Sequence, residues 1–74
     1  MEEKVLKILS VLLGRPIALG ENVIAQNEPK WDSLKHMEII MTIEDEFGIS
    51  FDVEDIPNLK SSEAIINRIK ELKK

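Results

Sequence analysis

The chain has 74 residues, 43% of them hydrophobic and 32% charged, with no cysteine and a formal net charge of −4. This length and composition predict a single globular domain over residues 1–74, and they exclude disulfides and thiolate metal sites. The N-terminus lacks the basic and then apolar layout of a secretory signal, and no apolar run is long enough to cross a bilayer. We therefore expect a cytoplasmic protein with no membrane partner.

The charge is unevenly distributed along the chain. Between Lys35 and Lys60 there is no lysine or arginine, but there are seven acidic residues: Glu38, Glu44, Asp45, Glu46, Asp52, Glu54 and Asp55. Such a segment repels nucleic acid phosphates and attracts basic protein surfaces. Its simplest explanation is a solvated face that keeps a small protein soluble. Either way, the sequence predicts no nucleic acid partner.

The first segment predicts a helix from about Glu2 to Leu13. Apolar residues recur there at helical spacing, and Gly14 with Pro16 shortly beyond it is typical of a helix end. From Arg15 to Lys30 the periodicity is lost, although four aliphatic residues remain: Ile17, Leu19, Val23 and Ile24. We expect this long first loop to lie over the core.

A second helix is predicted from about Ser33 to Phe47, ended by Gly48, with Asp32 or Ser33 as its N-cap. One face carries the core residues, and His36 lies on the same side: Ile39, Ile40, Ile43 and Phe47. The opposite side carries a second apolar stripe, interleaved with acids: Leu34, Met37 and Met41. The stripe is explained either by packing against the first loop or by an exposed surface for transient partners, which the interleaved acids favour.

The remaining chain predicts two more helical elements. Ile49, Phe51 and Val53 alternate as in a strand, but the absence of a partner strand favours a short helical turn around Asp52 to Ile56, before Pro57. A last helix begins at Ser61 or Ser62 and has an apolar face: Ile65, Ile66, Ile69 and Leu72. The predicted fold is all-α, a small up-and-down bundle of three main helices and one short helix with a long first loop.

The candidate for chemistry is Ser33, in the tripeptide Asp32-Ser33-Leu34. A serine at a helix start is usually only a cap. After a loop it is also accessible to a modifying enzyme, and helix N-terminal amides tolerate a phosphate. Other residues fit structural roles, since His36 has no nucleophile to activate, and Trp31 is expected to close the core.

The run from Trp31 to Ile49, WDSLKHMEIIMTIEDEFGI, resembles the central segment of acyl carrier proteins. The resemblance extends over the order of elements in essentially the whole chain. It implies a 4′-phosphopantetheine arm, donated by coenzyme A and linked to Ser33 beside Asp32, with acyl groups held as thioesters on the arm. It also implies that the chain is not itself an enzyme and that a phosphopantetheinyl transferase and acyl-transferring enzymes with basic patches are its partners.

The same resemblance assigns two further sets of residues. The partner-binding set is Leu34, Met37, Glu38, Met41, Glu44 and Asp45. The set lining a space for the acyl chain is Ile43, Phe51, Ile56, Leu59 and Ile65. We expect a monomer, since the chain is a shuttle between enzymes.

The chain departs from the fatty-acid carrier pattern at Lys30-Trp31, before the motif, and at Lys35, where an acid is usual. A base two residues from the serine changes the field that partners meet. These departures favour a specialised lipid or secondary-metabolite pathway. The alternatives are an aminoacyl or peptidyl carrier with the same arm, and a small helical interaction module that carries no arm.

Overall fold

The computed structural model describes residues 1–73, which fold into three α-helices and two short 3-10 turns. In chain order they are α1 (Glu2–Leu13), η1 (Ala25–Asn27), α2 (Ser33–Phe47), η2 (Ile56–Asn58) and α3 (Ser62–Leu72). Those residues form no strand, only an isolated antiparallel bridge between Ile24 and Ser61. The predicted all-α fold is confirmed, with the bounds of α1 and α2 where the sequence placed them.

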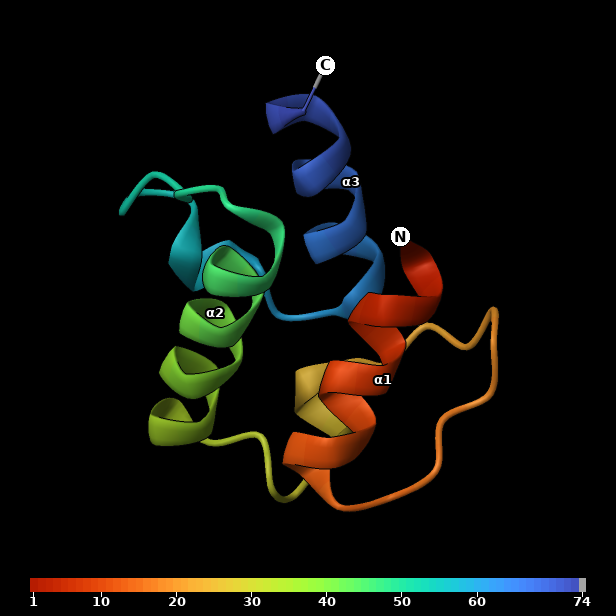
Figure 1. Cartoon of the computed structure of the whole chain (residues 1–74). Helices are drawn as coiled ribbons and strands as arrows, with labels where there is room; N and C mark the ends of the chain where they lie inside the picture. Colours follow the sequence, from red (N-terminus) through yellow and green to blue (C-terminus); the bar gives the residue numbers. More distant parts are fainter. Residues whose placement is uncertain (74) are drawn as a thin grey trace.

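The three helices surround one core, with α1 packed against both α2 and α3. In Figure 1, α1 and α2 run in opposite directions, whereas α3 runs in the same general direction as α2. This is because residues 48–61 bring the chain back along α2 before α3 begins. The first loop passes around the outside of α1 and returns to the start of α2.

Two glycines end the first two helices in the left-handed conformation. Gly14 has φ 72° and Gly48 has φ 63°, and their N–H groups donate to the carbonyls of Ser10 and Glu44. An L-residue pays a steric cost in this conformation and glycine does not. The glycines therefore fix where the chain leaves each helix, which places the loop before α2 and the loop after it.

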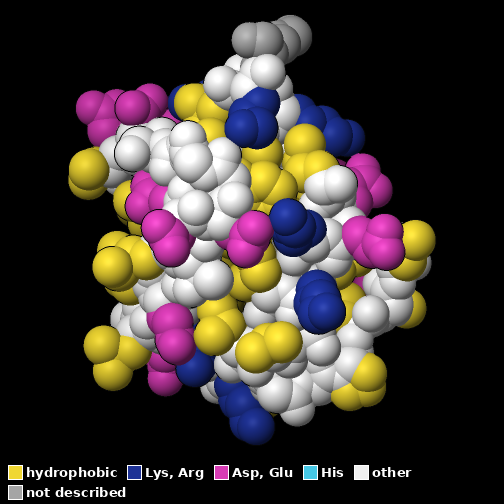
Figure 2. Space-filling model, in the orientation of Figure 1, with side chains coloured by type: hydrophobic (Ala, Val, Ile, Leu, Met, Phe, Trp, Pro, Cys, Tyr) yellow, Lys and Arg dark blue, Asp and Glu magenta, His cyan; other side chains and the backbone are white. Residues whose placement is uncertain are grey.

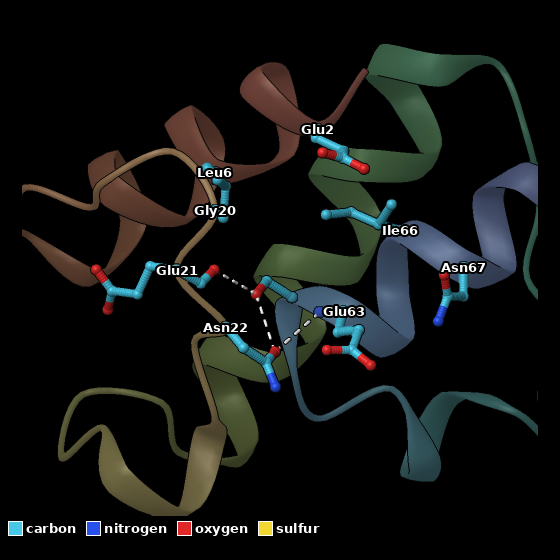
Figure 3. Close-up of a pocket in the computed structure, with 9 residues that line it drawn as sticks. Glu2, Leu6, Gly20, Glu21, Asn22, Glu63, Ile66 and Asn67 are labelled. Atoms are coloured by element: carbon cyan, nitrogen blue, oxygen red, sulfur yellow. Dashed lines mark hydrogen bonds between the residues drawn. The ribbon is translucent and has the colours of Figure 1, made fainter.

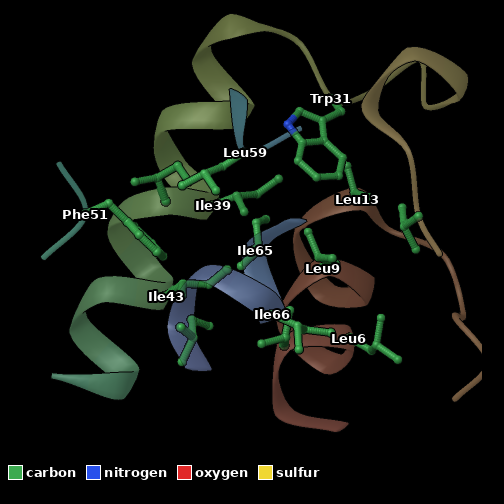
Figure 4. Close-up of a cluster of buried hydrophobic side chains, with 14 residues drawn as sticks. Leu6, Leu9, Leu13, Trp31, Ile39, Ile43, Phe51, Leu59, Ile65 and Ile66 are labelled. Carbon is green, nitrogen blue, oxygen red and sulfur yellow. The ribbon is translucent and has the colours of Figure 1, made fainter. Parts of the chain in front are cut away.

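The core is made of aliphatic side chains from all three helices and four residues outside them (Figure 4). The helices contribute Val5, Leu6, Leu9, Leu13, Ile39, Ile40, Ile43, Ile65, Ile66 and Ile69. The loops add Val23, Trp31, Phe51 and Leu59, and Trp31 lies beside Leu13 at one end of the cluster. Burying such side chains stabilises the fold by about 1.5–3 kcal/mol each. The expectation that the first loop covers the core is confirmed by Val23, whereas Leu19 is exposed.

Backbone pairing holds the first loop to the start of α3. Val23 N–H donates to Ser62 Oγ at 2.8 Å, Ser62 N–H donates to the Val23 carbonyl at 2.8 Å, and Ala25 N–H donates to the Lys60 carbonyl at 2.9 Å. Asn22 Oδ1 also accepts from the Glu63 N–H, as the dashed lines in Figure 3 show. Because Ser61 caps α3, the hydroxyl of Ser62 is available to bond the first loop.

An ion-pair network closes the other part of the first loop. The Arg15 guanidinium contacts Glu21 and lies 2.9 Å from Glu28 Oε2. Hydrogen bonding from Arg15 holds the pKa of Glu21 below its usual range, and the two carboxylates raise the pKa of Arg15 further above its usual value. The network stiffens the turn that follows α1.

The short elements are the part of the fold that the sequence placed least well. The helical turn expected around Asp52 to Ile56 is an irregular turn at residues 53–55, followed by the 3-10 turn η2. Pro57 does not end this element but lies near its start, where the missing N–H is not needed. η1 was not predicted at all, because a single turn has no periodicity to detect.

Candidate functional site

Ser33 is exposed at the first position of α2, and its hydroxyl forms no hydrogen bond within residues 1–73. The capping role falls to Asp32, whose Oδ1 accepts from the Lys35 N–H at 2.8 Å. Asp32 also has the extended backbone typical of an N-cap. The serine hydroxyl is therefore accessible and not used for capping.

The side chains on either side of Ser33 are joined in what we call the indole–imidazole chain, formed by Trp31, His36 and the Ile56 carbonyl. Trp31 Nε1 donates to His36 Nδ1 at 3.0 Å, and His36 Nε2 lies 2.8 Å from the Ile56 oxygen. Since an indole N–H can only donate, Nδ1 is the acceptor and the imidazole proton is on Nε2, where it bonds the carbonyl. Both side chains are 7% exposed, which confirms that His36 and Trp31 are packed.

A cavity of about 420 Å³ opens beside Ser33, between the start of α2 and η2. Trp31, His36, Ile56 and Pro57 form part of its wall, and the charged residues on its border are Asp32 and Lys60. The exposed serine thus borders a hollow lined by both apolar and polar side chains, with one cation and one anion at its border.

The apolar stripe on the outer side of α2 is exposed. Leu34 is 84%, Met37 45% and Met41 62% exposed, so they do not pack against the first loop. Figure 2 shows hydrophobic side chains projecting at its left edge, over α2, with acidic side chains among them. Exposed apolar groups of this size, ringed by charge, are typical of an interaction surface.

Most of the acidic residues between Lys35 and Lys60 have partners inside the molecule. Salt bridges from Lys35, Lys4 and Arg68 neutralise Glu38, Glu46, Asp52 and Asp55. Glu44 is half-buried, and its Oε2 accepts from the Phe51 N–H at 2.8 Å. Among the residues described, only Asp45 and Glu54 of this set have no such partner. The field of this segment is weaker than its count of acids indicates.

The residues expected to line a space for an acyl chain occupy two places. Ile43, Phe51, Leu59 and Ile65 are buried in the packed core, whereas Ile56 is half-buried and borders the cavity beside Ser33. Any guest in the core would therefore have to displace packed side chains.

Comparison with known proteins decides the family. A family model described as "Phosphopantetheine attachment site" matches residues 31–69. The chain is 35% identical to the "Acyl carrier protein homolog" of Mycoplasma genitalium, over 95% of this chain and 88% of the relative. It is 34% identical to the "Acyl carrier protein" of Rickettsia bellii, over 99% and 91% of the two chains. The chain belongs to the acyl carrier protein family.

As an acyl carrier protein, the chain is a carrier and not an enzyme, and its prosthetic group is 4′-phosphopantetheine. Acyl carrier proteins work with a phosphopantetheinyl transferase and with acyl-handling enzymes. When bound, the group supplies a thiol for thioester chemistry. The residues present fit such a group, since the matched region contains an exposed hydroxyl at a helix N-terminus beside a cavity.

Neither a membrane-spanning helix nor a metal-binding cluster occurs within residues 1–73. No helix within residues 1–73 combines the length and apolar character needed to span a membrane. The same residues contain no group of three or more His, Cys, Asp or Glu side chains that could hold a metal ion.

Proposed function

We propose that Ser33 is the attachment point of the 4′-phosphopantetheine arm. The observation that carries the proposal is the exposed hydroxyl of Ser33, left unbonded within residues 1–73 because Asp32 caps the helix in its place. Attachment forms a bond from the phosphorus next to pantetheine to the serine oxygen and breaks the pyrophosphate bond of coenzyme A. The nucleotide half leaves as 3′,5′-ADP, and the serine gives up its hydroxyl proton. The N–H groups at the start of α2 favour the resulting phosphodiester.

The arm's terminal thiol then holds an acyl group as a thioester. The chain has no cysteine, so the arm is its only source of a thiol. We propose that the cargo is passed between enzymes of a specialised lipid or secondary-metabolite pathway. Supporting this, Lys35 Nζ lies 2.8 Å from Glu38 Oε1 and cancels an acid close to the serine.

We propose that partner enzymes meet the outer side of α2. The exposed side chains of Leu34, Met37 and Met41 supply an apolar contact, and Asp45 supplies a charge that has no partner among residues 1–73. Such a surface gives fast association with modest affinity, which suits a shuttle. Glu38 and Glu44 contribute less, because each already has a bond inside the molecule.

Four further proposals follow from the same function. The carrier acts as a monomer and as one domain over residues 1–74, because an exposed serine and one exposed helix face are sufficient for loading and docking. It remains in the cytoplasm with its enzymes. The acyl chain is sheltered by Ile43, Phe51, Ile56, Leu59 and Ile65, with Ile56 at the entrance because it borders the cavity beside Ser33.

Intact-mass measurement tests the attachment. The chain is incubated with coenzyme A, magnesium and a promiscuous phosphopantetheinyl transferase, beside a carrier known to be a substrate. We expect one phosphopantetheine adduct on the wild type and on Ser50→Ala, an exposed serine away from the site, and none on Ser33→Ala. An unmodified wild type beside a modified control carrier would show that the chain does not take an arm, and an adduct on Ser33→Ala would exclude Ser33 as the anchor.

A further inference from the structure

The segment that holds Ser33 is fixed at both of its ends by side chains that bond each other. Trp31 lies two residues before the serine and His36 three residues after it, and Trp31 Nε1 donates to His36 Nδ1 at 3.0 Å. The two rings are nearly parallel, with an interplanar angle of 28°. The serine therefore lies within a short segment, residues 31–36, whose two ends are joined by a buried hydrogen bond.

The same imidazole also fixes the opposite wall of the cavity beside Ser33. His36 Nε2 donates to the Ile56 carbonyl at 2.8 Å, and both Ile56 and Pro57 of η2 border that cavity. One side chain thus links the segment before α2, α2 itself and η2. If it moves, the serine and the hollow beside it change together.

Only neutral His36 can complete the indole–imidazole chain. Adding a proton at Nδ1 would place two N–H donors against each other at the distance where Trp31 now donates, so that bond is lost while the bond to Ile56 remains. The charged residues that border the cavity with His36 are Asp32, from the start of α2, and Lys60, from the segment after η2. η1 and η2 contribute no titratable side chain to its lining, and α1 and α3 contribute no residue.

We infer that Trp31 and His36 are positioning residues for the attachment of the arm at Ser33, and that they act through the hydrogen bond between the indole and the imidazole. The inference rests on the proposed function of Ser33. A transferase must align the serine hydroxyl with coenzyme A, and a pre-formed segment lowers the ordering cost of that encounter. Loss of the bond between Trp31 and His36 makes the segment around Ser33 less ordered, which weakens recognition by the transferase.

Trp31 is the chain's only tryptophan, so its indole N–H gives one cross-peak in a ¹H–¹⁵N spectrum. At one fixed pH we expect the indole N–H to exchange slowly with deuterated solvent in the wild type, because the buried imidazole accepts from it. In His36→Phe the acceptor is gone, so the exchange is faster. Equal exchange rates in the wild type and His36→Phe, with helical circular dichroism retained, overturn the inference.

The kinetic test compares the KM and kcat of one transferase for each carrier at a single pH. We expect the KM to be about three- to tenfold higher for His36→Phe and Trp31→Phe than for the wild type, with kcat little changed. Ser50→Ala, which leaves the indole–imidazole chain intact, keeps the wild-type KM. Equal KM values in the wild type and these two variants would refute the positioning role.

The two proposals fail in different ways. A wild type that gains no adduct counts against Ser33 as the anchor. An adduct that forms with the same KM in His36→Phe and wild type counts against the positioning role alone. If Trp31→Phe fails to fold, the indole exchange rate and the KM of His36→Phe still decide the matter.

Discussion

The two ends of α2 hold their neighbouring loops by different chemistry. At the amino end the neutral His36 is buried and bonds both Trp31 and the Ile56 carbonyl. At the carboxyl end the charged Glu44 is only half-buried and bonds one backbone N–H, that of Phe51. A neutral imidazole whose two nitrogens are both hydrogen-bonded can be buried at little cost in free energy, whereas a carboxylate loses much more hydration on burial. The amino end, which carries the serine, therefore has the more deeply buried and more fully bonded contact of the two.

The largest expected effect is at the amino end. Trp31→Ala removes a buried ring from the core and leaves His36 Nδ1 without its donor, so we expect a loss of about 3–5 kcal/mol in the free energy of unfolding. Trp31→Phe should lose less, because the aromatic bulk remains. Guanidinium denaturation followed by circular dichroism measures both. A loss below about 1 kcal/mol for Trp31→Ala would show that the contacts at the amino end of α2 do not contribute more stability than those at its carboxyl end.

Removing the corresponding bond at the carboxyl end should cost less. Glu44→Ala leaves the Phe51 N–H without its acceptor, and we expect a loss of about 1–2 kcal/mol, since water can partly replace a half-buried carboxylate. The matched control is the neighbouring Asp45→Ala, which should change stability by less than about 0.5 kcal/mol. Similar losses in the two variants would mean that the bond to Phe51 contributes nothing.

A smaller effect is expected from the helix ends themselves. Asp32→Ala removes the N-cap acceptor and Gly48→Ala forces a side chain into the left-handed conformation, and each should cost about 1 kcal/mol. Thermal denaturation at a fixed pH compares them. A clearly larger loss in Gly48→Ala would indicate that the chain reversal, rather than the cap, is what holds α2 in place.

The smallest effect on stability is expected at the outer surface. Asp45→Lys should change the free energy of unfolding by less than about 0.5 kcal/mol but slow transfer of the arm about two- to fivefold at low salt, because it reverses a charge on the side of α2 that we propose for docking. Glu54→Lys makes the same charge change away from α2 and is the control. Equal rates in the two variants, with and without added salt, would remove Asp45 from the docking surface.

The main helices could be predicted from the sequence because their signals are local. Gly14 and Gly48 end α1 and α2 whatever the tertiary structure is, and the cap at Asp32 needs only the residues that follow it. The exposure of the α2 stripe was also predictable, since carboxylates alternate with Leu34, Met37 and Met41.

The internal bonds of the site could not be predicted, because their partners are distant in sequence or in another element. The resemblance to acyl carrier proteins assigns Glu44 to the partner-binding set, yet its carboxylate bonds a loop that begins beyond the end of α2. His36 was placed on the core side correctly, but its bond to Ile56 depends on how the second loop returns along the helix. The sequence shows only that His36 is a polar residue on the apolar face of α2. This position predicts that His36 is buried and hydrogen-bonded, but it does not predict which groups it bonds.

The pairing of the first loop with the start of α3 has a consequence for amide exchange with deuterated solvent. Val23, Ala25 and Ser62 lie in or beside loops, but their N–H groups donate to acceptors across the bridge between Ile24 and Ser61. Their exchange rates should resemble those of the helices, since releasing them requires α3 to separate from the rest of the molecule. If the amides of Val23 and Ser62 exchange slowly, their exchange rates will report when α3 begins to separate from the rest of the molecule during unfolding.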